Sequence, residues 1–256
     1  VGGFRAAGIS GMDIPINHPI RKSAAWAVHA YTALGVPLAL YSGWALLRSD
    51  VRGYFIALCA ACFVDATDGV LARRVQVKKV VPWFDGRRLD DIIDFIHYAF
   101  LPALSLPLLG ILPAGYAWFS VIPVLASCYG FCQEVAKTDD SFVGFPSYWN
   151  ILVVYLYFLG LSAQVNLAFI LTLSVLVFVP VHYVYPSRTP LLKPVNILLG
   201  ILWGLLLLLA CLEPDSPRAV LWVRLSLFYP VYYLAVTAVH HVRVKRMERL
   251  ARSGRV

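Results

Sequence analysis

The sequence predicts an all-α polytopic membrane protein, a helix bundle with about eight transmembrane helices. Hydrophobic residues make up 60% and charged residues 14% of the 256 residues, against roughly 45–50% and 25% in soluble domains. The mean hydropathy is +0.72. The apolar stretches approach the roughly 20 residues that a helix needs to cross a bilayer core. They lack the alternation of apolar and polar residues that is typical of a membrane β-barrel.

Eight apolar stretches divide the chain. We expect membrane spans at 24–47, 53–73, 90–110, 114–135, 148–163, 166–185, 195–212 and 219–241. Together they form one transmembrane catalytic domain, 24–241, after an N-terminal cytoplasmic or interfacial segment, 1–23, and before a basic cytoplasmic tail, 242–256. Several spans contain proline, which membrane helices tolerate better than soluble ones do.

The distribution of Lys and Arg predicts the orientation. With the N-terminus in the cytoplasm, eighteen of the 22 basic residues fall on the cytoplasmic side and three fall outside. Cytoplasmic loops of membrane proteins carry such an excess of positive charge. We therefore expect both termini in the cytoplasm. The net charge of +8 is explained in the same way, and no nucleic-acid partner is expected.

Four aspartates gather where the second predicted span ends and the third begins. Asp65 and Asp68 are three residues apart, and Asp90 and Asp94 are four apart, so each pair shares one helix face. Carboxylates in a membrane helix are costly and indicate function. Four of them side by side require positive charge, and hard divalent cations suit carboxylate oxygens. The cluster predicts a site for Mg²⁺ or Mn²⁺, in which two ions would hold a phosphate or pyrophosphate.

The residues around the aspartates fit a phosphate-bearing ligand. Gly69 and Ala72 remove side-chain bulk beside the first pair, and Gly86 does so just before the third span. Arg73 has the guanidinium geometry that holds a phosphate with two hydrogen bonds. The alternative is a set of interhelical salt bridges between the aspartates and nearby Arg and Lys. That alternative explains neither the glycines nor the spacing.

The two halves of this cluster resemble the signature of the CDP-alcohol phosphotransferase family. They read Asp65-x2-Asp68-Gly69-x2-Ala72-Arg73 and Gly86-x3-Asp90-x3-Asp94, separated by twelve residues. The gap is longer than is usual in the family, and we expect it to form a cytoplasmic turn over the nucleotide. The stretches 80–94, 137–138 and 142–150, and the eight-span layout, are most similar to the bacterial members that use choline.

The resemblance implies an activity. The phosphatidyl group of CDP-diacylglycerol would be transferred to the hydroxyl of choline, with release of CMP. The enzyme would lie in the bacterial inner membrane as a homodimer, with its active site at the cytoplasmic border. Asp65, Asp68 and Asp90 would bind two divalent cations, Mn²⁺ or Mg²⁺, and Asp94 would lie close to the second ion and serve as the general base. Asp65, Gly69, Ala72, Arg73 and Gly86 would bind the CDP moiety.

A choline acceptor calls for aromatic side chains, because a quaternary ammonium has no N–H and is held by aromatic faces and a carboxylate. The candidates are Tyr98, Glu134, Tyr148, Trp149, Asn150, Tyr183 and Tyr185. Glu134 would supply the counter-charge and Asn150 would orient the hydroxyl. Tyr and Trp also accumulate at membrane interfaces without any ligand. A phosphorylated acceptor would instead need basic residues such as Arg188 and Lys193.

Two other functions remain open from the sequence. The same site would serve another alcohol, such as serine, inositol or glycerol phosphate. A divalent-cation transporter would use the aspartates as its ion site, but its pathway would need polar residues through the whole depth of the membrane. The acidic residues here gather near one border instead, which favours the transferase.

Overall fold

The computed structural model describes residues 15, 18–134, 138, 141–186 and 188–253. Within these residues the protein is a helical bundle with one two-stranded sheet. Six helical segments are long and apolar enough to cross a membrane. The predicted class, an all-α polytopic membrane protein, is confirmed.

The six long segments coincide with six of the predicted spans. They are Pro19–Leu47, Val51–Val75, Gly86–Leu108, Ala114–Cys132, Lys193–Leu212 and Pro217–Ala251. The first comprises α1 (Pro19–Ala33) and α2 (Gly35–Leu47), the second is α3 (Val51–Val75), and the third comprises α5 (Gly86–Phe95), the π-helical turn η1 (Ile96–Phe100) and α6 (Leu101–Leu108). The fourth comprises η2 (Ala114–Ser120) and α7 (Val121–Cys132), the fifth is α10 (Lys193–Leu212), and the last comprises α11 (Pro217–Ser226) and α12 (Phe228–Arg252).

The other two predicted spans form shorter helices. The stretch 148–163 contains α8 (Trp149–Leu159), and 166–185 contains most of α9 (Ala163–Phe178). Gly160 adopts a left-handed conformation that ends α8, and the Ser162 hydroxyl caps the start of α9. With 11 and 16 residues, both helices are shorter than the roughly 20 residues of a complete span.

The end of the stretch 166–185 is a strand. Strand β2 (His182–Val184) pairs with β1 (Ser141–Val143) in antiparallel register, so that Phe142 lies opposite Tyr183. Pro180 stands two residues after the end of α9, and a proline there cannot continue the helix. The periodicity of a short apolar run does not distinguish a helix from a strand. The sequence therefore did not predict the hairpin.

Local capping fixes the two helices that carry the acidic motif. The Asp50 carboxylate accepts a hydrogen bond from the Gly53 backbone N–H at 2.8 Å and starts α3, and Gln76, with φ of 58°, ends it. The short helix α4 (Val77–Val80) fills part of the twelve-residue gap. The Asp85 carboxylate then accepts from the Arg88 N–H at 3.1 Å and starts α5. The longer gap is therefore a folded turn.

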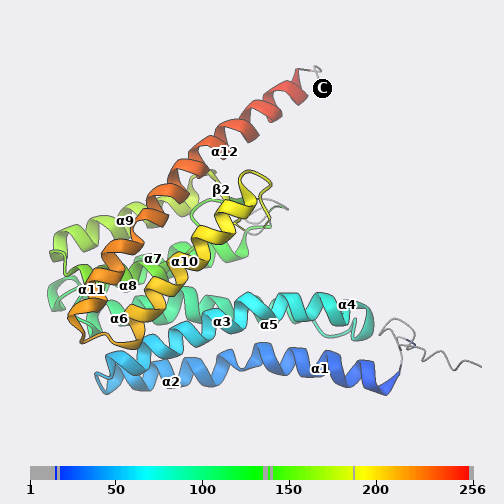
Figure 1. The fold of residues 1–256 in the computed structure, drawn as a ribbon, viewed down its shortest axis with the longest axis horizontal. Helices are drawn as coiled ribbons and strands as arrows, with labels where there is room; N and C mark the ends of the chain where they lie inside the picture. The colour runs from blue at the N-terminus through cyan, green and yellow to red at the C-terminus, as the bar shows by residue number, and fades with distance from the viewer. Residues whose placement is uncertain (1–14, 16–17, 135–137, 139–140, 187, 254–256) are drawn as a thin grey trace, which may run out of the picture.

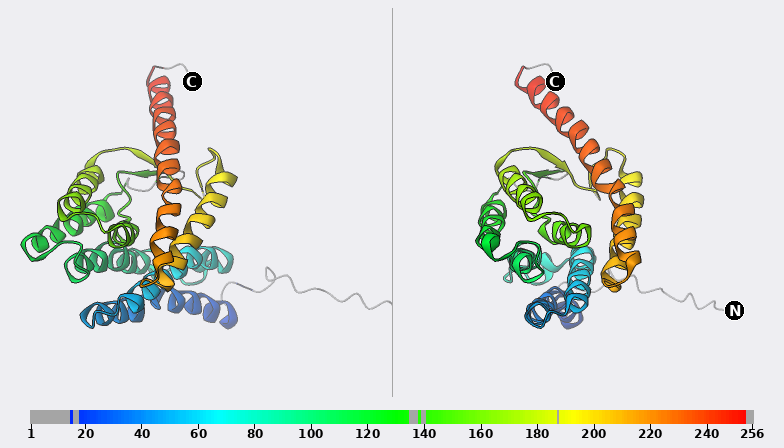
Figure 2. Two further views of the ribbon diagram at one scale, coloured as in Figure 1. Left: turned by 60° about the vertical axis from the view of Figure 1, so that its left-hand side comes forward. Right: turned by 90° about the vertical axis from the view of Figure 1, so that its left-hand side faces the viewer.

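Two apolar clusters position these helices. The gap packs its buried Val77, Val80 and Val81 against Ala25 and Val28 of α1. A larger core around Tyr54 and Phe55 joins α3 to α8 and α11. Figure 1 shows α1 and α2 end to end with α3 beside them, while α10 packs obliquely on α3 and α12 runs obliquely away from these helices. In Figures 1 and 2 the end of α12 extends beyond the bundle. The segment expected as a tail from residue 242 is a continuation of this helix to Arg252.

Candidate active site

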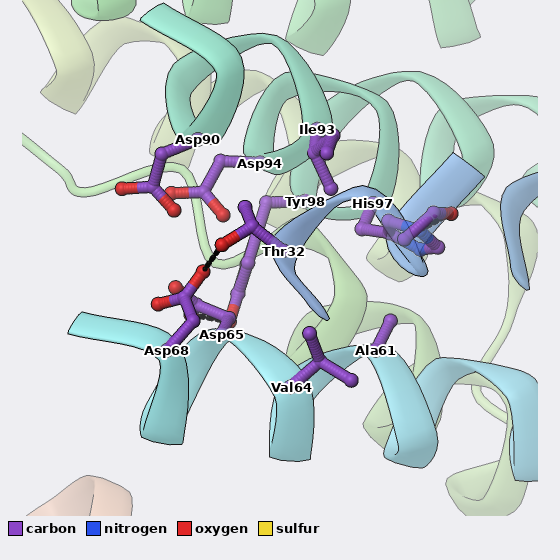
Figure 3. A pocket seen from close by; sticks show the side chains of 11 residues that line it. Thr32, Ala61, Val64, Asp65, Asp68, Asp90, Ile93, Asp94, His97 and Tyr98 are labelled. Atoms are coloured by element: carbon purple, nitrogen blue, oxygen red, sulfur yellow. Dashed lines mark hydrogen bonds between the residues drawn. The ribbon is translucent and has the colours of Figure 1, made fainter. Parts of the chain in front are cut away.

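A pocket lies between α1, α3 and α5, and it contains all four predicted aspartates (Figure 3). Asp65 and Asp68 point into it from α3, and Asp90 and Asp94 point into it from α5. The remaining lining residues are Thr32, Gly35, Ala61, Val64, Ile93, His97 and Tyr98. The structure therefore brings together side chains from two motif halves and from α1, which lies outside the motif.

The carboxylates lie close enough to share cations. Asp65, Asp68 and Asp90 each offer one carboxylate oxygen, and these oxygens all lie within 4.8 Å of one another. Asp68 is buried, while the other two are partly buried. The donor set consists of oxygen alone, which is the chemistry of Mg²⁺ and Mn²⁺ sites. The residues fit a divalent-cation site, and Asp94 lines the same pocket.

Hydroxyl groups hold two of the carboxylates in place. The Thr32 hydroxyl donates to Asp68 Oδ2 at 2.8 Å, and the Tyr98 hydroxyl donates to Asp65 Oδ2. Tyr98 lies in the π-helical turn η1, a feature often found at functional sites. The sequence assigns Tyr98 to choline, and this assignment stays a prediction beside the hydrogen bond to Asp65. Thr32 is not among the residues that the sequence predicts, because it lies on α1, outside the motif.

The residues predicted to bind CDP lie next to the acids. Gly69 and Ala72 follow Asp68 on α3, and Arg73 is exposed in the last turn. A Cβ at Gly69 would lie 3.3 Å from a terminal nitrogen of Arg73, so the glycine leaves room for the guanidinium. Ala72 packs against the buried cluster of α1 and the gap.

Gly86 has a different neighbour. A Cβ at this position would lie 2.4 Å from the Cε1 atom of His29. The His29 ring lies 4.5 Å from the ring of Phe84 and 5.7 Å from that of Trp26. Gly86 is thus the point where the start of α5 approaches α1, and its lack of a side chain permits that approach.

Three of the predicted choline residues, Tyr148, Tyr183 and Tyr185, gather beside the hairpin. Tyr148 and Tyr183 form, with Phe142, what we call the aromatic wall, and Tyr185 packs against it. The ring of Tyr148 lies 6.2 Å from Phe142, which stacks on Tyr185 at 4.6 Å. Tyr183 follows on the paired strand. Tyr148 also lies directly before α8, whose Asn150 hydrogen-bonds Cys62 of α3, one turn before Asp65.

The other predicted choline residues have different surroundings. Trp149 is buried and donates its Nε1–H to the Ser127 hydroxyl at 2.7 Å. The Asn150 amide is buried and donates to Cys62 Sγ at 3.2 Å. Glu134 is exposed after α7.

Tyr185 has two close neighbours at its ring. Phe142 stacks on the ring, and the Arg188 guanidinium lies over it at 4.7 Å from the ring centroid.

The chain resembles curated proteins over most of its length, although no family model matches it. It is 40% identical to the phosphatidylcholine synthase of Legionella pneumophila over 237 residues, which cover 86% of this chain and 91% of that protein. It is 37% identical to the phosphatidylcholine synthase of Pseudomonas aeruginosa, over 84% of this chain and 94% of that protein. With the phosphatidylcholine synthase of Borreliella burgdorferi it shares 30% identity, over 84% and 93%.

The chain belongs to the phosphatidylcholine synthase family. The predicted relationship to the choline-using bacterial enzymes is thereby confirmed, and so is the predicted class, a phosphatidyltransferase. A phosphatidylcholine synthase works on membrane lipid, which agrees with the six apolar helices.

Proposed function

We propose that this protein transfers the phosphatidyl group of CDP-diacylglycerol to the hydroxyl of choline, giving phosphatidylcholine and CMP. The observation that carries the proposal is the meeting of four aspartates in one pocket, in a chain of the phosphatidylcholine synthase family. Relatives named for phosphatidylcholine synthesis favour this reaction over a cation transporter and over other acceptors.

Asp65, Asp68 and Asp90 would hold two divalent cations, Mn²⁺ or Mg²⁺, with Asp94 close to the second. The oxygen-only donor set and the spacing within 4.8 Å support this assignment. When bound, such ions neutralise a pyrophosphate and stabilise the departing CMP. The carboxylates in turn need those ions, since several negative charges at low dielectric are strongly destabilising without a counter-charge.

Asp94 would be the general base. A choline hydroxyl is a poor nucleophile, so a carboxylate must accept its proton as the oxygen attacks the phosphatidyl phosphorus. The bond from that phosphorus to the CMP oxygen then breaks. Asp94 lines the pocket but is not one of the three residues whose oxygens cluster most tightly. A position beside the cation cluster suits a group that accepts the proton of the choline hydroxyl.

Gly69, Ala72 and Arg73 would bind the CDP moiety beside Asp65. An exposed guanidinium five residues beyond Asp68 suits the phosphates, and Gly69 leaves the space that it occupies. Gly86 would act differently, because its contact is with His29. We assign it the placement of α5, and with it of Asp90 and Asp94, against α1.

Choline would be held between the aromatic wall and the aspartates of the acidic pocket. Tyr148 is best placed to contact the ammonium, because its ring lies beside Phe142 and it stands two residues before Asn150, which hydrogen-bonds Cys62 one turn before Asp65. Tyr183 would complete the aromatic wall. Asp65 and Asp94 would supply negative charge. Tyr185, Trp149 and Asn150 would act as supports of this wall, and Glu134 lies exposed beyond α7.

The orientation in the membrane is part of the same proposal. The excess of basic residues supports a cytoplasmic position for both termini and the acidic pocket in a bacterial inner membrane, where the lipid chains would stay in the bilayer and CMP would leave into water. We also propose a homodimer, on the family resemblance alone.

Release of CMP by the purified protein tests the proposal. CDP-diacylglycerol and Mn²⁺ would be supplied in detergent, with choline, serine, inositol and glycerol phosphate offered in parallel. We expect release with choline alone, and its loss when a chelator removes the metal. Release with another alcohol would overturn the aromatic choline site. No release with any acceptor would overturn the transferase assignment for this pocket.

A further inference from the structure

We infer that Thr32 is a positioning residue for the cation site, acting through Asp68. The inference rests on the proposed cation site and extends it to α1, a helix outside the acidic motif. Thr32 points into the pocket (Figure 3), and its hydroxyl lies 2.8 Å from Asp68 Oδ2. Thr32 is 7% and Asp68 6% exposed, so water has little access to replace this bond.

The hydroxyl proton has one preferred destination. Thr32 Oγ1 also lies near the Val28 carbonyl oxygen, but at 3.4 Å, beyond the usual range of O–H···O bonds. The carboxylate is closer and charged, and hydrogen bonds to charged groups are the stronger ones. The β-branched side chain of Thr32 has few rotamers on a helix. The proton is therefore directed at Asp68.

This bond selects the orientation of the Asp68 carboxylate. With Oδ2 held by Thr32, the side chain no longer rotates freely, and its other oxygen is left for a cation shared with Asp65 and Asp90. Tyr98 makes the equivalent bond to Asp65. Hydrogen bonds of this kind to metal-binding carboxylates typically change metal affinity by about 10- to 100-fold. Two hydroxyls, those of Thr32 and Tyr98, thus orient two of the three clustered carboxylates. Neither residue belongs to the acidic motif.

The preceding residue provides a matched control. The Tyr31 hydroxyl shares a hydrogen bond of 2.8 Å with the Thr67 hydroxyl. It joins the same two helices, α1 and α3, one residue away, but reaches no acid. Tyr31→Phe therefore removes a bond of similar length across the same interface and leaves Asp68 untouched.

Manganese binding tests the inference without relying on turnover. Free Mn²⁺ would be measured by electron paramagnetic resonance during titration of the purified full chain, for the wild type, Thr32→Val, Thr32→Ser and Tyr31→Phe. We expect Thr32→Val to weaken Mn²⁺ binding by about 10- to 100-fold. Thr32→Ser should restore binding, because it restores the hydroxyl, and Tyr31→Phe should bind like the wild type. The KM for choline at saturating Mn²⁺ should stay unchanged in Thr32→Val.

Several results would overturn the inference. Wild-type affinity in Thr32→Val would show that the bond does not matter, and a Ser variant as weak as Val would assign the effect to packing of the methyl group. Equal weakening in Tyr31→Phe would assign it to the helix interface. If Thr32→Val does not purify as a folded protein, Thr32→Ala takes its place against Thr32→Ser. A wild type without saturable Mn²⁺ binding would instead overturn the proposed cation site itself.

Discussion

Tyr98 donates its hydroxyl hydrogen to the Asp65 carboxylate, from the π-helical turn η1 to helix α3. The bond joins the two halves of the acidic motif through a residue that belongs to neither. It also fixes one oxygen of a carboxylate that lies within 4.8 Å of its neighbours. Tyr98 therefore lines the acidic pocket, and its contact with choline stays a prediction.

Tyr98→Phe should impair the metal site and spare choline binding. The ring remains, but Asp65 loses its donor, so the Mn²⁺ concentration for half-maximal activity should rise by about tenfold. The KM for choline at saturating Mn²⁺ should barely change. Kinetics over a grid of Mn²⁺ and choline concentrations separate the two. An increase in the choline KM with an unaltered Mn²⁺ requirement would return Tyr98 to the choline site.

Tyr148→Leu should have the opposite effect. A cation over an aromatic face gains about 0.5–2 kcal/mol, so the choline KM should rise by about 2- to 30-fold. Tyr148→Phe keeps the face and should keep the KM. Tyr41→Leu, which removes an exposed tyrosine on α2, serves as the control. Equal choline KM values in all four proteins would remove Tyr148 from the acceptor site.

Gly86→Ala should destabilise the contact between α1 and α5. The new methyl group would lie 2.4 Å from His29 Cε1, and overpacking of this kind costs about 1–3 kcal/mol. We expect a lower thermal midpoint and reduced activity. His29→Ala opens the space, so the double variant should lose less than the two single changes together. Strictly additive losses, measured by thermal unfolding in detergent, would show that the two residues do not interact.

His182 predicts a pH effect on stability. It lies 3.6 Å from Glu248 of α12, and its backbone N–H donates to His241 Nδ1. Burial lowers the pKa of His182 below 6.5 despite the nearby Glu248 carboxylate. Folding therefore favours the neutral form of His182. Its contribution to the free energy of unfolding is complete above pH 6.5 and is lost as the pH falls through the lowered pKa.

Thermal midpoints between pH 8 and pH 5 would test this for the wild type and His182→Gln. The wild type should lose more stability on acidification, because the variant has no imidazole to protonate at this position. The difference between the two curves isolates His182 from other groups. Parallel curves would show that the histidine titrates alike in the folded and unfolded chains.

The acidic site could be predicted from the sequence because it depends on local spacing. Residues three or four apart on a helix share a face wherever that helix lies. This rule paired Asp65 with Asp68, and Asp90 with Asp94, on common helix faces. The contributions of Thr32 and His29 could not be predicted in this way. They depend on how α1 packs against α3 and α5, and no local pattern encodes that approach.

The aromatic wall shows the same limit. The sequence named Tyr148, Tyr183 and Tyr185 among seven choline candidates, but it did not predict the β1–β2 hairpin that aligns Phe142 with Tyr183. An apolar run ending at a proline reads equally well as the end of a long helix. It also could not show that Trp149 and Asn150 turn toward Ser127 and Cys62.

The most direct test of the acidic pocket as the catalytic centre compares two neighbouring aspartates. Asp94 lines the pocket, whereas Asp91 on the same helix is exposed. With CDP-diacylglycerol, Mn²⁺ and choline supplied, CMP release by Asp94→Asn should fall by at least about 100-fold. Asp91→Asn, as a surface change, should stay within about twofold of the wild type. Comparable activity in Asp94→Asn and the wild type would contradict the assignment of Asp94 as the general base and, with it, of this pocket as the catalytic centre.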